Sequence, residues 1–153
     1  MPSITPFLWF DGQAEEAMNF YLSIFKNAKA LEVKRAKNGK ATWVSFELEG
    51  QKFSGFNAGP QYKFTEAISM FVDCKTQAEV DELWEKLSAG GSESRCGWLK
   101  DKFGLSWQII PQELSRLLYD PDPEKAKAVM QAMLKMDKII IADLRKAYDG
   151  RAA

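Results

Sequence analysis

The sequence contains no histidine among its 153 residues. Histidine is the commonest general base near neutral pH and the commonest metal ligand in proteins. Its absence excludes a Ser-His-Asp triad, a Cys-His dyad and every zinc site that includes an imidazole. Any chemistry must therefore come from carboxylates, Lys, Tyr, Cys, amides or a bound cofactor.

An excess of charge of either sign is also missing, because 21 Lys and Arg residues balance 21 Asp and Glu residues. This balance predicts no nucleic-acid partner. The densest apolar runs, 7–10 and 139–142, are far shorter than the roughly 20 residues that span a bilayer, so we expect no membrane partner. The two cysteines cannot build a four-thiolate site, and no secretory leader is visible. We expect a cytoplasmic protein with free thiols.

The pattern of hydrophobic residues predicts the same order of elements twice. In the first half, a strand over 4–10 precedes an amphipathic helix over 13–25, with Asp11 as its expected cap, and strands at 30–35, 42–48 and 51–57. In the second half, a strand over 67–72 precedes a helix that a Thr76/Glu79 capping box opens, and three more strands follow up to Pro111. We therefore predict an α+β protein with two paired βαβββ modules, 4–58 and 66–111, in one domain over 1–111.

The last part of the chain, 112–153, has a different pattern and is predicted to be a helical extension. Asp122 followed by Pro123 is typical of a helix start. Two apolar stripes follow, separated by an expected break near Asp137 and Lys138. This apolar tail is either a dimer interface or an intramolecular cover, and the sequence leaves both open.

Several motifs resemble one known superfamily. Paired βαβββ modules of this length are similar to the vicinal-oxygen-chelate superfamily, which includes glyoxalase I, bleomycin-resistance proteins and extradiol dioxygenases. The individual sequence motifs resemble those of its PhnB-like branch, which is often labelled 3-demethylubiquinone-9 3-methyltransferase. The matching stretches are 7–17 (FLWFDGQAEEA), 59–60 (GP), 64–69 (FTEAIS), 77–81 (QAEVD), 96–101 (CGWLKD) and 102–111 (KFGLSWQIIP).

The resemblance implies where a metal would sit if one were kept. Metal-binding members use His, Glu or Gln on the first, fourth, fifth and eighth strands. The resemblance places three of these positions at Thr5, Ala67 and Gln108, and the fourth near Gly55 or Asn57. Threonine and alanine cannot replace His ligands, so we expect no metal and no other cofactor. No glycine-rich strand–turn–helix for S-adenosylmethionine is visible either, so the residues do not support the methyltransferase label.

The superfamily's cupped sheet is nevertheless expected to remain. Strand register puts aromatic rings, hydroxyls and amides inside it, which is typical of a small-molecule pocket. Ser106, Gln108 and Ile110 are predicted to share one face of the last strand. The alternative is that these aromatic side chains simply fill the core. The expected pocket residues are Phe7, Trp9, Trp43, Asn57, Ser69, Phe71, Trp98 and Gln108.

The residues next to Trp98 allow two interpretations. Lys100 could lower the pKa of Cys96 and create a reactive thiol, but a structural cysteine in a strand is favoured because no histidine can assist it. For the whole chain we predict a metal-free small-molecule-binding protein. One alternative is an enzyme of the same superfamily, of lyase, isomerase or transferase type, acting on a small carbonyl or aromatic substrate. The other is a structural or interaction module with a filled cup. The resemblance further implies a homodimer.

Overall fold

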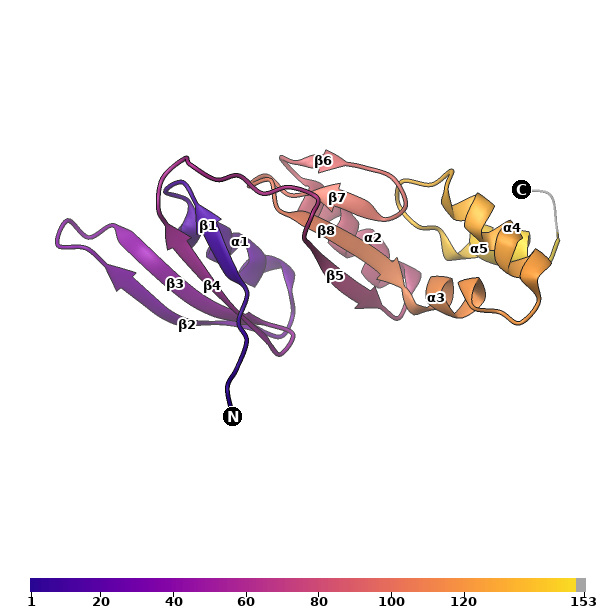
Figure 1. Ribbon diagram of the computed structural model, residues 1–153, viewed down its shortest axis with the longest axis horizontal. Helices are drawn as coiled ribbons and strands as arrows, with labels where there is room; N and C mark the ends of the chain where they lie inside the picture. Colours follow the sequence, from indigo (N-terminus) through magenta and orange to yellow (C-terminus); the bar gives the residue numbers. More distant parts are fainter. Residues whose placement is uncertain (151–153) are drawn as a thin grey trace. The chain divides into compact units, whose positions relative to one another are not determined.

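The computed structural model describes residues 1–150 (Figure 1). The chain divides into two compact units, Met1–Phe64 and a second unit that begins at Thr65. Each unit contains one four-stranded mixed sheet. None of the helices within the described residues has the length and apolar character needed to cross a bilayer.

The first unit is a βαβββ module. Its elements are β1 (Phe7–Phe10), α1 (Ala14–Ile24), β2 (Ala28–Arg35), β3 (Ala41–Leu48) and β4 (Gln51–Asn57). The strand order is β1-β4-β3-β2, in which β1 runs parallel to β4 and the other pairs are antiparallel. Because side chains alternate along a strand, one face is apolar and packs on α1. The buried residues of that face include Leu8, Phe10, Val44, Phe46 and Phe53.

The second unit repeats this plan. Its sheet contains β5 (Ser69–Cys74), β6 (Ser92–Glu93), β7 (Trp98–Lys100) and β8 (Ser106–Pro111), in the order β5-β8-β7-β6. The helix α2 (Gln77–Ser88) buries Val80, Trp84 and Leu87. The structure thus confirms the predicted fold class, two βαβββ modules with mixed sheets.

Two strands begin later than the sequence pattern predicts. The first starts at Phe7 rather than at residue 4, because Pro6 lacks the N–H that a ladder requires and contributes only its carbonyl, which Ser54 N–H contacts at 3.0 Å. The fifth runs over Ser69–Cys74 rather than 67–72. Thr5 and Ala67 therefore precede β1 and β5 instead of lying within them.

The helix starts are partly as predicted. Thr76 Oγ accepts a hydrogen bond from Glu79 N–H, and Asp122 accepts from Glu124 N–H, which confirms both caps. Asp11 is not the cap of α1, so that expectation was wrong. The helix begins after Gln13, whose side chain makes no cap bond.

The C-terminal region consists of three helices, α3 (Gln112–Leu118), α4 (Pro123–Met133) and α5 (Ile141–Tyr148). The sequence pattern missed α3, and the predicted break before the last helix is confirmed. The helices pack within the second unit, so the apolar tail covers its own sheet end. The buried cluster comprises Ile110, Leu114, Leu117, Val129, Ile139 and Leu144.

The segment before α5 is fastened to the sheet and to α2. Cys96 N–H and Gly97 N–H donate to the carbonyls of Met136 and Asp137, each at 2.8 Å. The side chain of Gln77 then bridges the next residues, because its Nε2 donates to Ile139 O (3.0 Å) and its Oε1 accepts from Ile141 N–H (2.7 Å). Gln77 thus caps α5 from a different helix.

Replacing Gln77 with alanine is expected to loosen the tail. The change removes two partly buried hydrogen bonds and leaves an uncapped helix end, which should cost about 2 kcal/mol of unfolding free energy. Hydrogen exchange should accelerate most at the amide of Ile141 and along α5. Gln51→Ala, which removes only an exposed bond to Lys52 O, is the control. Unchanged exchange along α5 in Gln77→Ala would contradict this role.

Candidate functional site

The open face of the second sheet collects the predicted pocket residues of that unit. Strand register pairs Trp98 and Phe71 with Gln108, and Ser69 with Ser106, so these side chains share the face opposite α2. Gln108 Nε2 donates to Ser69 Oγ at 2.9 Å. The other face is apolar and lies against α2, where Leu99, Trp107 and Ile109 are buried.

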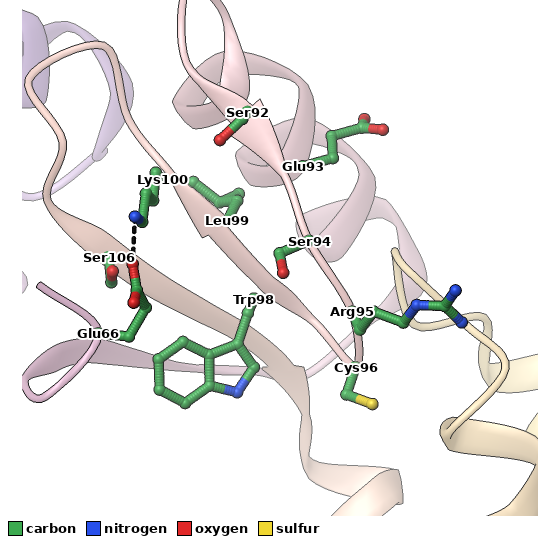
Figure 2. Close-up of a pocket in the computed structure, with 10 residues that line it drawn as sticks. All are labelled: Glu66, Ser92, Glu93, Ser94, Arg95, Cys96, Trp98, Leu99, Lys100 and Ser106. Carbon is green, nitrogen blue, oxygen red and sulfur yellow. Dashed lines mark ion pairs between the residues drawn. The ribbon is translucent and has the colours of Figure 1, made fainter.

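A pocket of about 550 Å³ opens on this face (Figure 2). Its lining residues include Trp98, which the sequence pattern identified, and Glu66, Ser94, Lys100 and Ser106. The predicted pocket residues Ser69, Phe71 and Gln108 share the sheet face but are not in this lining. Glu66 and Lys100 were not predicted as pocket residues. Lys100 could have been predicted from the sequence, because it lies two residues after Trp98 and strand alternation places both side chains on one face of β7.

The β7–β8 hairpin places Lys100 and Ser106 opposite each other, since the two residues are register partners. The connecting loop is held by the buried carboxylate of Asp101. Its Oδ1 accepts from the backbone N–H groups of Phe103 (2.8 Å) and Leu105 (3.1 Å), and its Oδ2 accepts from Trp107 Nε1 (2.9 Å). Asp101 therefore fixes the geometry of one end of the pocket from behind the sheet.

Two polar groups at this end have contrasting environments. Ser106 is fully buried, and its Oγ has no hydrogen-bond partner within residues 1–150. Lys100, by contrast, forms an ion pair with Glu66, which belongs to the segment before β5. The hydrogen bond and charge of Lys100 lower the pKa of Glu66, so this carboxylate is ionised at neutral pH.

The cysteines give no sign of a nucleophilic site. Both thiols are free, as expected. Burial raises the pKa of Cys74 to about 12, which keeps this thiol protonated and unreactive. Cys96 lies in the turn before β7 and not in a strand, so that part of the prediction was wrong. It lines the pocket, and its Sγ lies 3.6 Å from Met133 O.

The first unit has its own aromatic face, opposite α1. The ring of Phe56 lies 5.7 Å from Phe7 and 6.0 Å from Trp9, measured between centroids. Tyr62, from the segment after β4, packs edge-on against Trp9 at 4.9 Å. Trp43 joins this face through its register partner Phe56, and Lys34 Nζ lies 4.8 Å from its ring. Three of the four predicted pocket residues of the first unit therefore share one face.

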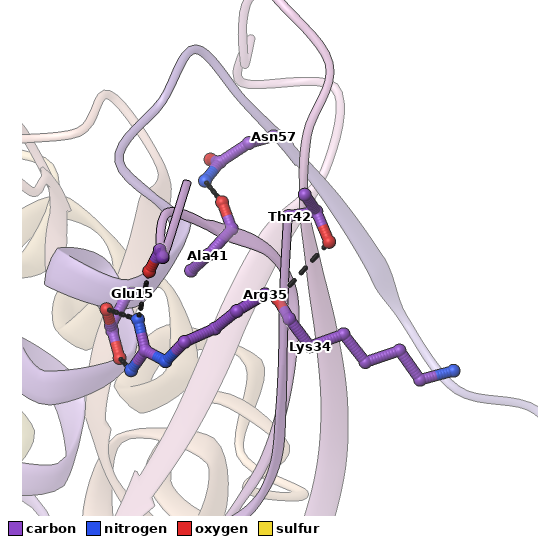
Figure 3. Close-up of polar contacts among 7 residues, drawn as sticks. Glu15, Lys34, Arg35, Ala41, Thr42 and Asn57 are labelled. Atoms are coloured by element: carbon purple, nitrogen blue, oxygen red, sulfur yellow. Dashed lines mark hydrogen bonds and ion pairs between the residues drawn. The ribbon is translucent and has the colours of Figure 1, made fainter. Parts of the chain in front are cut away.

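Asn57, the fourth, lies on the α1 side of the sheet instead. Its Oδ1 accepts from Ala14 N–H at 2.9 Å and so caps α1. Its Nδ2 donates to Ala41 O (Figure 3). The amide thus joins the helix start to β3. Nearby, Arg35 forms a two-pronged ion pair with Glu15 of α1. Both contacts hold the module together.

The residues at the positions that the resemblance assigns to metal ligands do not fit a metal ion. Thr5 and Ala67 offer no imidazole or carboxylate, and the amide nitrogen of Gln108 is bonded to Ser69. Within residues 1–150, no three Cys, Asp or Glu side chains gather into a candidate ligand set. A single amide is a poor ligand for a divalent cation.

Comparison with solved structures defines the fold as that of the glyoxalase and bleomycin-resistance proteins. A glyoxylase/bleomycin resistance protein/dioxygenase domain from Frankia sp. is 13% identical, with 72% of this chain and 92% of that chain covered and a TM-score of 0.52. The fosfomycin resistance protein FosX from Listeria monocytogenes, complexed with Mn(II) and sulfate, is 17% identical, with coverage of 69% and 88% and a TM-score of 0.53.

A more specific match defines the family. The model of the 3-demethylubiquinone-9 3-methyltransferase family matches residues 2–110, and the chain belongs to this family. A putative 3-demethylubiquinone-9 3-methyltransferase, PhnB protein, from Bacillus cereus is 34% identical, with 72% of this chain and 99% of that chain covered and a TM-score of 0.68. No curated protein gives a significant match. The family match stops before α3, so the C-terminal helices lie outside it.

Proposed function

We propose that this protein binds a small organic molecule on the open face of the second sheet, without a metal ion in the site. The observation that carries the proposal is the pocket of about 550 Å³ in which a buried hydroxyl, Ser106 Oγ, has no partner among the described residues. Burying a polar group without a hydrogen bond costs free energy, and a bound ligand would supply that bond.

The side chains on this sheet face argue against the alternative that the aromatic residues simply fill the core. Trp98 is only half-buried, and Phe71 on the same face is 55% exposed. Large apolar side chains left open beside polar groups are typical of ligand pockets. The side chains of Ser69 and Gln108 form a hydrogen bond with each other, whereas the Ser106 hydroxyl has no partner within residues 1–150 and is available to a ligand. These features favour a binding site over a purely structural module.

A homodimer is part of the proposal, because dimers are common in the superfamily that the motifs resemble. The described helices α3 to α5 already cover the end of their own sheet, so this cluster is used within the chain. The rings of Phe7 and Phe71 are among the exposed apolar side chains of the two sheets.

Native mass spectrometry of protein purified from its own host tests this proposal. We expect a dimer that releases a non-covalent organic molecule on denaturation, and elemental analysis with no stoichiometric metal. Trp98→Ala should lose that molecule, whereas Trp43→Ala in the first unit should retain it. About one metal ion per chain, or a crystal structure with the pocket packed solid by its own side chains, would contradict the proposal.

A further inference from the structure

The ion pair between Glu66 and Lys100 places a carboxylate inside the proposed pocket. Glu66 comes from the segment before β5, and Lys100 comes from β7. Figure 2 shows this pair beside Ser106 and the indole of Trp98, at one end of the pocket. The structure thus already shows one carboxylate bound next to an aromatic ring and an unpartnered hydroxyl.

The pair is open to solvent and can be exchanged. The side chain of Glu66 is 60% exposed and that of Lys100 is 42% exposed. Exposed ion pairs contribute little to stability, because water and salt screen them and two long side chains must be ordered. A carboxylate from a ligand would replace Glu66 at Lys100 while leaving one ammonium–carboxylate pair in place.

Ser106 gives a ligand an advantage over Glu66. Its hydroxyl is buried opposite Lys100 in the β7–β8 register and has no partner within residues 1–150. A carboxylate has two oxygens, so one can accept from Lys100 and the other from the Ser106 hydroxyl. Glu66 makes only the first of these two contacts.

The other charged side chains of the pocket leave Lys100 as the cation at this end. Glu93 accepts a hydrogen bond from Trp84 Nε1 at 2.7 Å, which occupies one of its oxygens. Arg95 extends away from Lys100 and Ser106 (Figure 2). The half-buried Trp98 supplies the flat apolar wall on which an aromatic ring can stack.

We propose that Lys100 and Ser106 bind the carboxylate of a small aromatic acid, and that Glu66 occupies the place of that carboxylate in the free protein. This inference rests on the proposed function and specifies its ligand class. Ligand binding displaces Glu66 from Lys100, so Glu66 competes with the ligand and lowers its affinity. A neutral molecule cannot replace the negative charge of Glu66 at Lys100 and therefore binds more weakly.

Benzoate and benzamide test the proposal, since they have the same shape and differ in charge. Binding is measured from the NMR signal of the Trp98 indole N–H, assigned with a Trp98→Phe variant. We expect benzoate to bind about tenfold more tightly than benzamide. Glu66→Gln should tighten benzoate binding about fivefold and leave benzamide unchanged. Lys100→Met should remove the preference for benzoate, and Ser106→Ala should weaken benzoate about fivefold.

The control is Glu85→Gln, which removes the same charge from the exposed surface of α2. It should leave benzoate affinity unchanged, and the melting temperature of each variant shows whether it is folded. Equal affinity for the two probes, or no gain in Glu66→Gln, would overturn the inference while the small-molecule pocket stands. If neither probe shifts the Trp98 signal, the inference fails, and native mass spectrometry decides the proposed function separately.

Discussion

Gly97→Ala is expected to lower the free energy of unfolding by about 3 kcal/mol. Gly97 has a φ of +84°, which strains any L-residue with a Cβ by about 1–2 kcal/mol. The added Cβ would also lie 2.7 Å from Ile110 Cδ1, 3.0 Å from Ile109 O and 3.2 Å from Ile139 Cγ1. Overpacking of this kind typically costs about 1–3 kcal/mol.

Gly104→Ala is the matched control for this effect. Gly104 has nearly the same φ, +87°, but nothing lies within 4 Å of an added Cβ. This variant should therefore show the backbone strain alone, about 1 kcal/mol. Urea unfolding followed by circular dichroism measures both. Equal losses in the two variants would show that the contacts with Ile109, Ile110 and Ile139 do not matter.

Asp101→Ala is expected to cost about 4 kcal/mol. The carboxylate is 2% exposed and accepts hydrogen bonds from two backbone N–H groups and from the Trp107 indole. Its removal leaves three donors without their acceptor at a buried turn, and each unsatisfied group costs about 1–3 kcal/mol. Urea unfolding followed by circular dichroism measures the loss.

Asp101→Asn should recover only part of this loss. An amide has one acceptor oxygen and two N–H donors, so its nitrogen would face either the loop amides or the indole N–H. Asp149→Ala, at the exposed end of α5, is the control and should change stability by less than about 0.5 kcal/mol. Full stability in Asp101→Asn would show that the negative charge and second acceptor are not needed.

Asp101 affects the proposed ligand pocket through the β7–β8 loop and not by direct contact with a ligand. The loop that it holds sets the register of Lys100 with Ser106, and these two side chains define one end of the pocket. A variant that keeps the fold but loosens this loop should weaken ligand binding, although Asp101 lies on the buried side of the sheet. Asp101 is a positioning residue in this respect.

Local patterns were sufficient to predict the type and order of most strands and helices. Strand alternation repeats every two residues and helical stripes recur every three or four, so both are visible in a short stretch of sequence. The Thr76 and Asp122 caps were predictable for the same reason, since each lies next to the N–H groups that it binds. The short helix α3 was missed because its seven residues carry only two buried positions, Leu114 and Leu117.

The cap of α1 shows where local reasoning fails. Asp11 is of the right type and close to the helix, but the acceptor at Ala14 N–H is Asn57, which lies 43 residues away. The pairing of β1 with β4 brings the end of β4 to the start of α1, and no local pattern contains that information. Asn57 directly follows Phe56 in β4, so strand alternation alone places its side chain on the face opposite the aromatic rings.

The sequence by itself determined that no imidazole is available in this chain, and that threonine and alanine stand at Thr5 and Ala67, the positions that the resemblance assigns to metal ligands. The sequence also determined which side chains alternate to one face of β7 and β8. Only the tertiary structure decided that Glu66 meets Lys100, that Ser106 has no partner and that Gln77 fastens the tail. The contacts of Glu66 with Lys100 and of Gln77 with the tail join residues far apart in the chain. They depend on how the strands and helices pack and not on any local sequence preference.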